Sequence, residues 1–205
     1  SVARCLRSLG RTEEALKMTE NTQPALLTVS VAAFAVLKQR GIAADYVAGH
    51  SLGEYSALVA AGSLAFADAV RLVRKRGQYM QAAVAPGVGA MAALLKLPEG
   101  KLAEVLEQAA QGEVVSAANL NSPDQVVVAG HAGAVNRAVE LAKAAGARRA
   151  VILPVSAPFH CSLMSPAQAN LKADLDATTF RDLTSPLINN WQAREIHTGA
   201  EAREG

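Results

Sequence analysis

One five-residue stretch, Gly49-His50-Ser51-Leu52-Gly53, restricts the folds open to this chain more than any other feature. It stands between a short apolar run, Asp45 to Ala48, and a helix-forming run, Glu54 to Ala61. A Gly-x-Ser-x-Gly pattern in this context is typical of a sharp strand-to-helix turn that presents a nucleophilic serine. The flanking glycines are expected because side chains there would collide with neighbouring main chain. The pattern therefore predicts an α/β fold in which Ser51 projects from the turn.

The same turn predicts how a reacting group could be stabilised. A helix that starts at Ser51 directs unpaired backbone N–H groups and the positive end of its dipole towards the site. The N–H of Leu52 is then a natural donor to an oxyanion formed during acyl transfer. The alternative is a Gly/Ser turn without chemistry, but the strand and helix on the correct sides of the motif favour the catalytic interpretation.

Composition restricts the class of protein. The 205 residues are 51% hydrophobic and 19% charged, which is typical of a globular protein with a substantial core. A net charge of +2 gives no reason to expect a nucleic acid or an anionic membrane as partner. No apolar run approaches the roughly 20 residues that span a bilayer, and the first residues lack the apolar core of a signal peptide. We therefore expect a cytosolic protein.

The two cysteines, Cys5 and Cys161, lack metal-ligand spacing, so we expect no metal site and two reduced thiols rather than one disulfide. The chain lacks an initiator Met and closes on a polar stretch, residues 198–205, which does not resemble the end of a packed domain. These features indicate an incomplete chain.

Hydrophobic periodicity predicts two domains. Helices are expected from Gln23-Pro24 to Arg40, from Phe66 to Gln81 and from Ala167 to Leu175. After a turn-rich segment, residues 85–89, apolar and helical runs alternate in the β-α-β-β-α-β order of a ferredoxin-like unit. These runs are 91–97, 99–110, 114–119, 125–130, 133–145 and 149–155. The prediction is an α/β-hydrolase-like main domain with a parallel sheet, residues 1–86 and 157–205, and an inserted ferredoxin-like small domain, residues 87–156.

A serine hydroxyl is a weak nucleophile until a base accepts its proton, so Ser51 needs a histidine that folding brings near it. His50 is adjacent and is expected to support the turn, His131 starts a helix and suits a capping or surface role, and His197 lies in the polar tail. His160 remains, in a proline-bounded loop where the small domain returns to the main one. It is the candidate base, and the alternative is a core or surface histidine.

Arg76 is the exception within a basic run on the second predicted helix. At about 100° per residue, Arg71 and Lys75 point away from the apolar stripe, whereas Arg76 lies at its edge. A guanidinium held against an apolar face needs an anion, and its planar fork suits a carboxylate. The alternatives are a structural salt bridge or an arginine whose charged head reaches solvent.

With Ser51, Arg76 and His160 identified, the chain resembles, over nearly its whole length, the malonyl-CoA:acyl-carrier-protein transacylases of bacterial fatty-acid synthesis, which are related to the acyltransferase domains of polyketide synthases. The matching segments, in the family's order, are 21–26, 49–58, 76–77, 119–123 and Phe159-His160 followed by Leu163-Met164. The resemblance implies that Ser51 attacks a malonyl thioester while His160 accepts its proton. The malonyl group then passes from coenzyme A to the phosphopantetheine thiol of acyl carrier protein in a ping-pong mechanism, without a metal or a bound redox cofactor.

The resemblance also implies how the acyl group is selected. Arg76 matches the arginine that pairs with the free carboxylate of malonyl. Phe159 before the histidine, with Leu52 after the serine, resembles the pattern of malonyl rather than methylmalonyl selectors. Met80 and Asn119 match positions near the family's pocket.

Two family segments are absent from the sequence. The family begins with a strand and a Phe-Pro-Gly-Gln-Gly-Ser-Gln loop whose glutamine helps to build the oxyanion hole, and nothing similar precedes Ser1. The loop whose carbonyl orients the catalytic histidine would follow Gly205, and Asn189 and Asn190 resemble the residues that approach it. Loss of one oxyanion donor costs about 2.7–4 kcal/mol in the transition state, so we expect poor turnover from the chain as given.

Two other classes of function stay open. A serine hydrolase, either an esterase or a thioesterase, would use the same serine but needs no cation beside the acyl group. A non-catalytic carrier-protein docking fragment would use exposed basic side chains, and its association would depend on salt concentration. The candidate basic residues are Arg71, Arg74 and Lys75, or Arg148 and Arg149.

Overall fold

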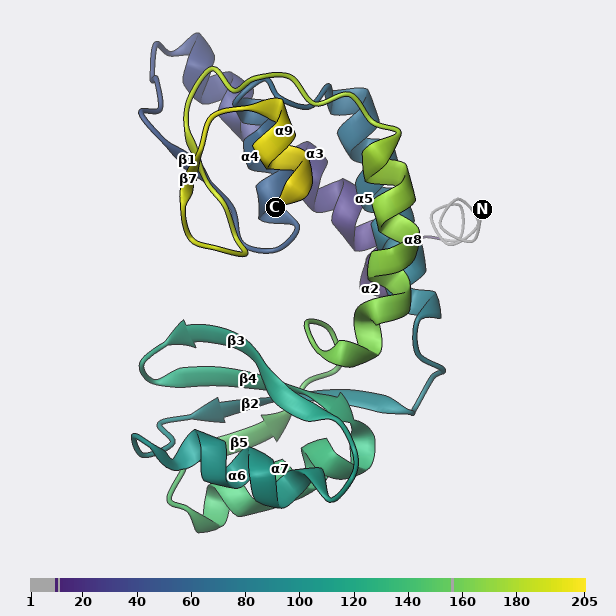
Figure 1. The fold of residues 1–205 in the computed structure, drawn as a ribbon, viewed down its shortest axis with the longest axis vertical. Coiled ribbons are helices and arrows are strands. Elements are labelled where there is room, and N and C mark those ends of the chain that lie inside the picture. The colour runs from purple at the N-terminus through teal and green to yellow at the C-terminus, as the bar shows by residue number, and fades with distance from the viewer. Residues whose placement is uncertain (1–9, 11, 156) are drawn as a thin grey trace. The chain divides into compact units, whose positions relative to one another are not determined.

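The computed structural model describes residues 10, 12–155 and 157–205, and it divides the chain into two compact units (Figure 1). Unit 1 consists of the residues up to Gln78 together with Asn170–Gly205, and unit 2 is Tyr79–Ala169. The sequence placed the corresponding boundaries at 86/87 and 156/157. Both observed boundaries fall inside helices, where no local change of composition marks them. Cys5 lies outside the described residues.

Helices make up most of unit 1. They are α2 (Thr12–Lys17), α3 (Thr19–Gln39), α4 (Gly53–Ala60), α5 (Phe66–Ala82), α8 (Ser165–Asp176) and α9 (Gly199–Glu204), of which α5 and α8 extend into unit 2. The helix predicted over Phe66 to Gln81 is confirmed as α5, because its apolar stripe has a clear helical period.

The predicted start of α3 at Gln23-Pro24 was wrong, since the helix already begins at Thr19. Its first turns pack closely on α5: a Cβ on Gly77 would lie 2.5 Å from the Cα of Glu20. Arg74 of α5 also donates a hydrogen bond to Asn21 Oδ1 at 2.7 Å. These tertiary contacts stabilise helical turns ahead of the proline, and local propensity alone does not reveal them.

A small sheet carries the serine turn. Its strands are β1 (Val47–Ala48), β6 (Leu187–Ile188) and β7 (Glu195–Ile196), in the order β1-β6-β7. β1 and β6 are parallel, and β6 and β7 are antiparallel, so the predicted parallel sheet is represented by one parallel pair. Leu187 and Ile196 are fully buried in the core of unit 1. Because β1 and β6 run in the same direction, the residues that follow each strand leave from the same edge of the sheet.

Unit 2 confirms the predicted β-α-β-β-α-β order. Its elements are β2 (Gly89–Leu95), α6 (Lys101–Ala110), β3 (Val115–Ser122), β4 (Gln125–His131), α7 (Ala132–Ala144) and β5 (Arg149–Ile152). All neighbouring strands are antiparallel, in the order β3-β4-β2-β5. Alternate residues of β2 face opposite sides: Ala92 and Leu94 join one apolar cluster, and Met91 and Ala93 join another. A short 3₁₀ helix, Ser162–Met164, precedes α8.

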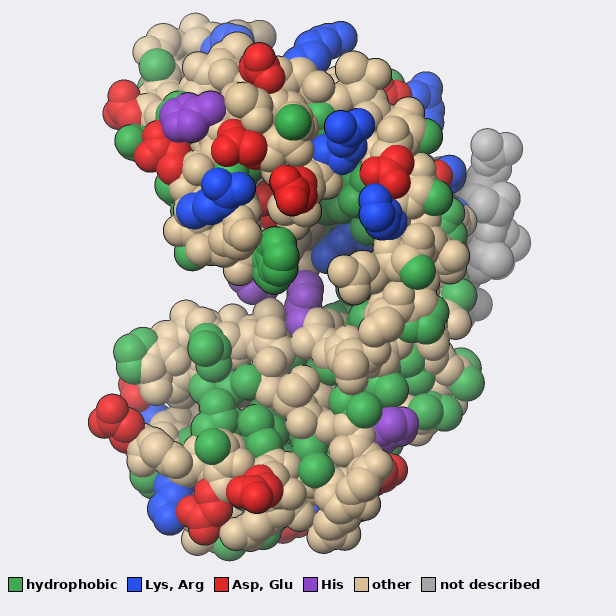
Figure 2. Space-filling model, viewed as in Figure 1, with side chains coloured by type: hydrophobic (Ala, Val, Ile, Leu, Met, Phe, Trp, Pro, Cys, Tyr) green, Lys and Arg blue, Asp and Glu red, His purple; other side chains and the backbone are tan. Residues whose placement is uncertain are grey.

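The basic run on α5 is neutralised within unit 1. Arg71 pairs with Asp68 at 2.6 Å, Lys75 pairs with Asp174, and Arg74 lies 3.7 Å from Glu20. On the visible face of unit 1, acidic and basic side chains are interspersed (Figure 2). Among the described residues, no helix has the length and apolar character needed to cross a membrane.

Candidate active site

Ser51 lies shortly after β1 in the left-handed region of backbone conformation, with a φ of +53°. Such a backbone costs a non-glycine residue about 1–3 kcal/mol and persists only where surrounding contacts hold it. Gly49 allows the chain to return closely, because a Cβ there would collide with the backbone of Gly53 and Glu54. A Cβ on Gly53 would meet nothing within 4 Å. The expectation that both glycines prevent a collision is therefore confirmed for Gly49 and wrong for Gly53.

The helix after the turn begins at Gly53 with Leu52 as its N-cap, and not at Ser51 as predicted. A left-handed residue cannot belong to a right-handed helix, so the strained conformation of Ser51 delays the helix start. The N–H groups of residues 53–55 donate to carbonyl oxygens three residues earlier, at 2.9–3.2 Å. Within the described part of the chain, no acceptor is hydrogen-bonded to the N–H of Leu52. This donor therefore remains available beside the serine.

Arg76 extends from α5 to the serine, and its Nη2 donates to Ser51 Oγ at 2.9 Å. Its Nη1 donates to Gln23 Oε1 at 2.7 Å, and its guanidinium carbon lies 5.9 Å from the centroid of the Tyr55 ring. Burial lowers the pKa of Arg76, and the charges of Tyr55 and Glu54 oppose this shift. The group stays protonated at neutral pH. No carboxylate of the described residues forms a salt bridge with Arg76, so its hydrogen-bond partners are neutral.

Sequence reasoning missed two residues that hold this arrangement. Gln23 is only 5% exposed, and its Nε2 donates to Thr19 Oγ1 at 3.1 Å, which directs its Oε1 towards Arg76. Asn190 follows β6, and its Oδ1 accepts a hydrogen bond from the N–H of Ser51 at 2.7 Å. Both residues lie in segments noted for their similarity to a family, but that similarity alone does not give their roles.

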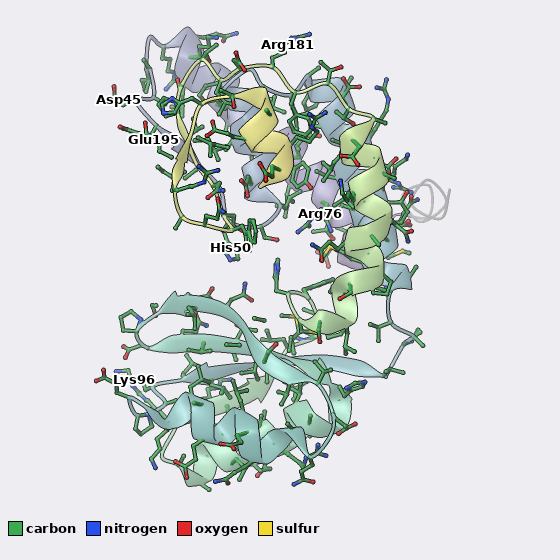
Figure 3. The ribbon with its side chains drawn as sticks, viewed as in Figure 1. Asp45, His50, Arg76, Lys96, Arg181 and Glu195 are labelled. Atoms are coloured by element: carbon green, nitrogen blue, oxygen red, sulfur yellow. The ribbon has the colours of Figure 1, made fainter. Side chains whose placement is uncertain are left out.

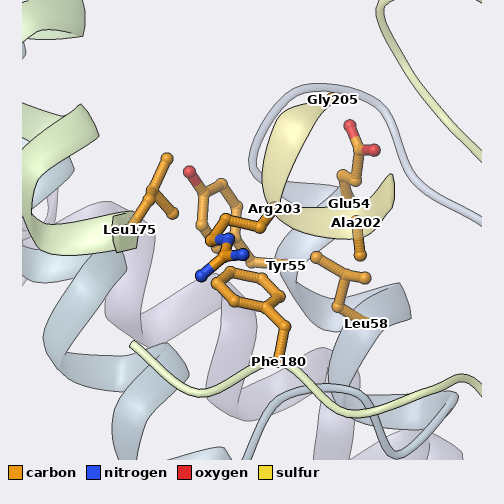
Figure 4. A pocket seen from close by; sticks show the side chains of 8 residues that line it. All are labelled: Glu54, Tyr55, Leu58, Leu175, Phe180, Ala202, Arg203 and Gly205. Carbon is orange, nitrogen blue, oxygen red and sulfur yellow. The ribbon is translucent and has the colours of Figure 1, made fainter. Parts of the chain in front are cut away.

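Glu54 and Tyr55, in the first turn of α4, line a small pocket of unit 1 (Figure 4). The other lining residues are Leu58, Leu175, Phe180, Ala202, Arg203 and Gly205. Burial raises the pKa of both Glu54 and Tyr55. For Glu54, a hydrogen bond from the N–H of Asn190 and the positive charge of Arg76 act in the opposite direction. The carboxyl therefore keeps its proton to higher pH in the folded state than in the unfolded chain.

This raised pKa predicts a pH-dependent contribution of Glu54 to stability. From its ordinary pKa of 4.5 up to the raised value, the folded state binds more protons than the unfolded state. The free energy of unfolding therefore falls as pH rises through this window. Glu54→Gln removes the titration, so the variant should gain stability relative to the wild type as pH rises from 4.5. Urea unfolding over a pH series measures the difference.

Glu13→Gln, at an exposed position on α2, provides the matched control for this change. The raised pKa of Glu54 would be contradicted by either of two results. The difference in the free energy of unfolding between the Glu54→Gln variant and the wild type could stay constant with pH, or it could change in the opposite direction.

The remaining predicted residues lie in unit 2. His160 also has a left-handed backbone, with a φ of +59°, and its side chain is exposed. Phe159 packs with Met91 on one face of the sheet. Met80 is buried on α5, and Asn119 is half-buried in β3, next to a register shift against β4. Unit 1 thus brings together Ser51, Leu52 and Arg76, whereas the other four candidates are positioned by unit 2.

Two of the four histidines are engaged in other local structure. His131 Nδ1 accepts a hydrogen bond from the N–H of Val114 at 2.9 Å, and His197 Nε2 lies 3.0 Å from Glu195 Oε1. His50 is exposed beside Ser51 and points outward from the turn (Figure 3). Within the described ranges, no group of three or more histidine, cysteine or acidic side chains could hold a metal ion.

A strained serine contacted by an arginine that has no acidic salt-bridge partner among the described residues suits transfer of an acyl group that carries its own negative charge. The chain belongs to the acyl transferase domain family, which matches residues 3–203. Its curated relatives include the malonyl CoA-acyl carrier protein transacylase of Escherichia coli strain K12, which is 56% identical over 178 residues, or 86% of this chain and 58% of the relative. The protein of the same name from Bacillus subtilis strain 168 is 50% identical over 192 residues, or 93% of this chain and 61% of the relative.

Solved structures give the same assignment. The malonyl CoA-acyl carrier protein transacylase of Coxiella burnetii superposes with a TM-score of 0.92 at 46% identity, covering 95% of this chain and 62% of that one. A malonyl-transacylase in complex with a type II polyketide synthase acyl-carrier protein superposes with a TM-score of 0.91 at 45% identity, covering 95% and 63%. The chain thus spans about three fifths of the length of the proteins that it matches.

Proposed function

We propose that this chain provides the nucleophile and the acyl-selecting cation of an enzyme that transfers malonyl from coenzyme A to acyl carrier protein. The observation that carries the proposal is the 2.9 Å hydrogen bond from Arg76 Nη2 to Ser51 Oγ, made by a partly buried guanidinium whose partners are neutral. The named activity of relatives at 50–56% identity supports it. No resident metal or redox cofactor takes part in the proposed reaction. We propose that the enzyme acts in the cytoplasm.

In the first half-reaction, Ser51 Oγ attacks the carbonyl carbon of the malonyl thioester. A C–O bond forms, the C–S bond breaks, and the serine proton passes through His160 to the coenzyme A thiolate. The N–H of Leu52 donates to the oxyanion of the tetrahedral intermediate. In the second half-reaction, the phosphopantetheine thiol of acyl carrier protein attacks the ester carbonyl carbon. A C–S bond forms, the C–O bond to Ser51 breaks, and the thiol proton passes through His160 to Ser51 Oγ.

Arg76 selects the acyl group in this proposal. The guanidinium is already desolvated and has only neutral hydrogen-bond partners among the described residues, so it gains a charge-assisted, two-pronged contact when a free carboxylate arrives. An acetyl group cannot form this contact and leaves the guanidinium without a carboxylate. The pocket therefore favours malonyl over acetyl. Phe159, Met80 and Asn119 are proposed to line the malonyl pocket together with Arg76.

The experiment that tests the proposal mixes the protein with malonyl-CoA and measures a covalent malonyl adduct by intact mass. His160→Ala should slow adduct formation by about 10²–10⁴-fold, the usual contribution of a general base. The matched control is His197→Ala, because that side chain is exposed and pairs with Glu195. Adduct formation at an unchanged rate in the His160 variant would remove this residue from the mechanism.

The same measurement separates the competing functions. A hydrolase would release the acyl group to water without carrier protein and would show no preference that depends on Arg76. A docking fragment would form no adduct and would bind carrier protein in a salt-dependent way. The intramolecular ion pairs of Arg71 and Lys75 argue against the docking function at that face.

A further inference from the structure

Asn190 is joined to the serine turn by two hydrogen bonds. Its Oδ1 accepts from the N–H of Ser51 at 2.7 Å, and its own N–H donates to Glu54 Oε2 at 3.2 Å. The first bond holds the residue with the left-handed backbone, and the second holds the first turn of the following helix. Ser51 and Asn190 are 139 residues apart in sequence, so this attachment exists only in the folded protein.

Sheet topology explains why Asn190 reaches the turn. Ala48 and Ile188 are paired at the ends of the parallel strands β1 and β6. The segments that follow these two strands therefore leave the sheet at the same edge, one towards Ser51 and the other towards Asn190.

The neighbouring residue, Asn189, fixes the direction of Asn190. Asn189 is 2% exposed, and its Oδ1 accepts hydrogen bonds from the N–H groups of Gln192 and Arg194, both at 3.1 Å. Its own N–H donates to the carbonyl oxygen of Arg194 at 2.9 Å. The side chain of Asn189 thus closes the turn between β6 and β7. Asn190 therefore extends from a turn that these hydrogen bonds hold in place.

We propose that Asn190 is a positioning residue for the nucleophile and acts through the main-chain amide of Ser51. Because this amide donates to Asn190, the peptide plane of Ser51 is fixed, and with it the direction of Oγ towards Arg76 Nη2. The same bond leaves the N–H of Leu52 as the donor of the turn that can face an oxyanion. The inference deepens the proposed function and rests on it.

The test compares Asn190→Ala with Asn190→Asp in single-turnover malonyl loading. The Ala variant loses the acceptor, so its maximal loading rate should fall by about 10²-fold, with little change in the half-saturating malonyl-CoA concentration. The Asp variant keeps an oxygen in the same place and should retain most of the rate. Asn170→Ala, at an exposed site on α8, is the control. A wild-type rate in the Ala variant, or an equal loss in the Asp variant, overturns the proposal.

A second variant covers failure of the Ala protein to fold. Asn190→Gln keeps the amide but moves its oxygen by one methylene, so it should also load slowly while thermal unfolding stays close to that of the wild type. Loading at the wild-type rate overturns the proposal, and so does a loss that occurs only together with lowered stability.

A substrate-independent probe separates this inference from the proposed function. An organophosphorus fluoride reacts with a positioned serine: an O–P bond forms, the P–F bond breaks, and the hydroxyl proton and fluoride leave as HF. Peptide mapping locates the label. If the probe labels Ser51 in the wild-type protein but malonyl-CoA forms no adduct, the proposed function is overturned and the positioning role of Asn190 is not. Labelling of the Asn190→Ala variant at the wild-type rate overturns the role of Asn190.

Discussion

Replacing Ser51 with alanine is expected to abolish the malonyl adduct, with a loss of loading rate on the order of 10⁶-fold, as for other serine nucleophiles. The ester bond forms on Oγ, and no other group of the turn can take its place. The hydrogen bond to Asn190 uses the main-chain N–H of Ser51, so it survives the substitution. Intact mass measures the adduct, and thermal unfolding checks that the variant is folded.

Ser56→Ala is the matched control, because Ser56 lies on α4 close to Ser51 in sequence and has no place in the proposed reaction. Full loading is expected in this variant. An adduct that persists in the Ser51 variant at the wild-type level would show that another residue carries the acyl group, and the proposed mechanism would fail.

Arg76→Ala is expected to weaken the preference for malonyl over acetyl. Malonyl loading should fall by about 10²-fold or more relative to acetyl loading, because truncating one partner of a buried charge pair costs about 2–5 kcal/mol. Acetyl loading does not use the guanidinium and should change much less. Competition between malonyl-CoA and acetyl-CoA, read out by intact mass, gives the ratio directly.

Two further variants sharpen the role of Arg76. Arg71→Ala removes the same charge from the same helix, but at an exposed position paired with Asp68, and should leave the preference unchanged. Arg76→Lys keeps the charge without the planar fork, so an intermediate preference is expected. If the Arg76→Ala protein selects malonyl as strongly as the wild type does, the guanidinium is not the selecting group.

Elements with strong local periodicity could be predicted from the sequence. Helix α5 and all four strands of unit 2 lie close to their predicted positions, because alternation in strands and the 3.6-residue period in helices are properties of neighbouring residues. The early start of α3 and the two-residue strands β6 and β7 were not predicted. Long-range contacts stabilise these elements: Gly77 packs against Glu20, and β6 pairs with β1.

In the candidate site too, residues with a local sequence signal were predicted, and residues placed by long-range contacts were not. The pattern around Ser51 predicted the strained turn, and the helical stripe distinguished Arg76 from the other basic residues of α5. Gln23 and Asn190 have no periodic or motif signal of their own, because each acts through a single side-chain amide. Folding brings Gln23 to Arg76 across 53 residues of sequence, and Asn190 to Ser51 across 139 residues. The roles of His160, Phe159, Met80 and Asn119 remain predictions, and the His160→Ala variant tests the first of them.

The pairing of β1 with β6 also has a consequence for protein synthesis. The ribosome completes the serine segment long before it reaches β6, because the whole of unit 2 is translated between them. Unit 2 pairs strands that are closer in sequence and can fold while translation continues. The serine turn gains its sheet partner only when residues 187–188 emerge. The hydrogen bond from the N–H of Ser51 to Asn190 likewise forms only after residue 190 has been synthesised.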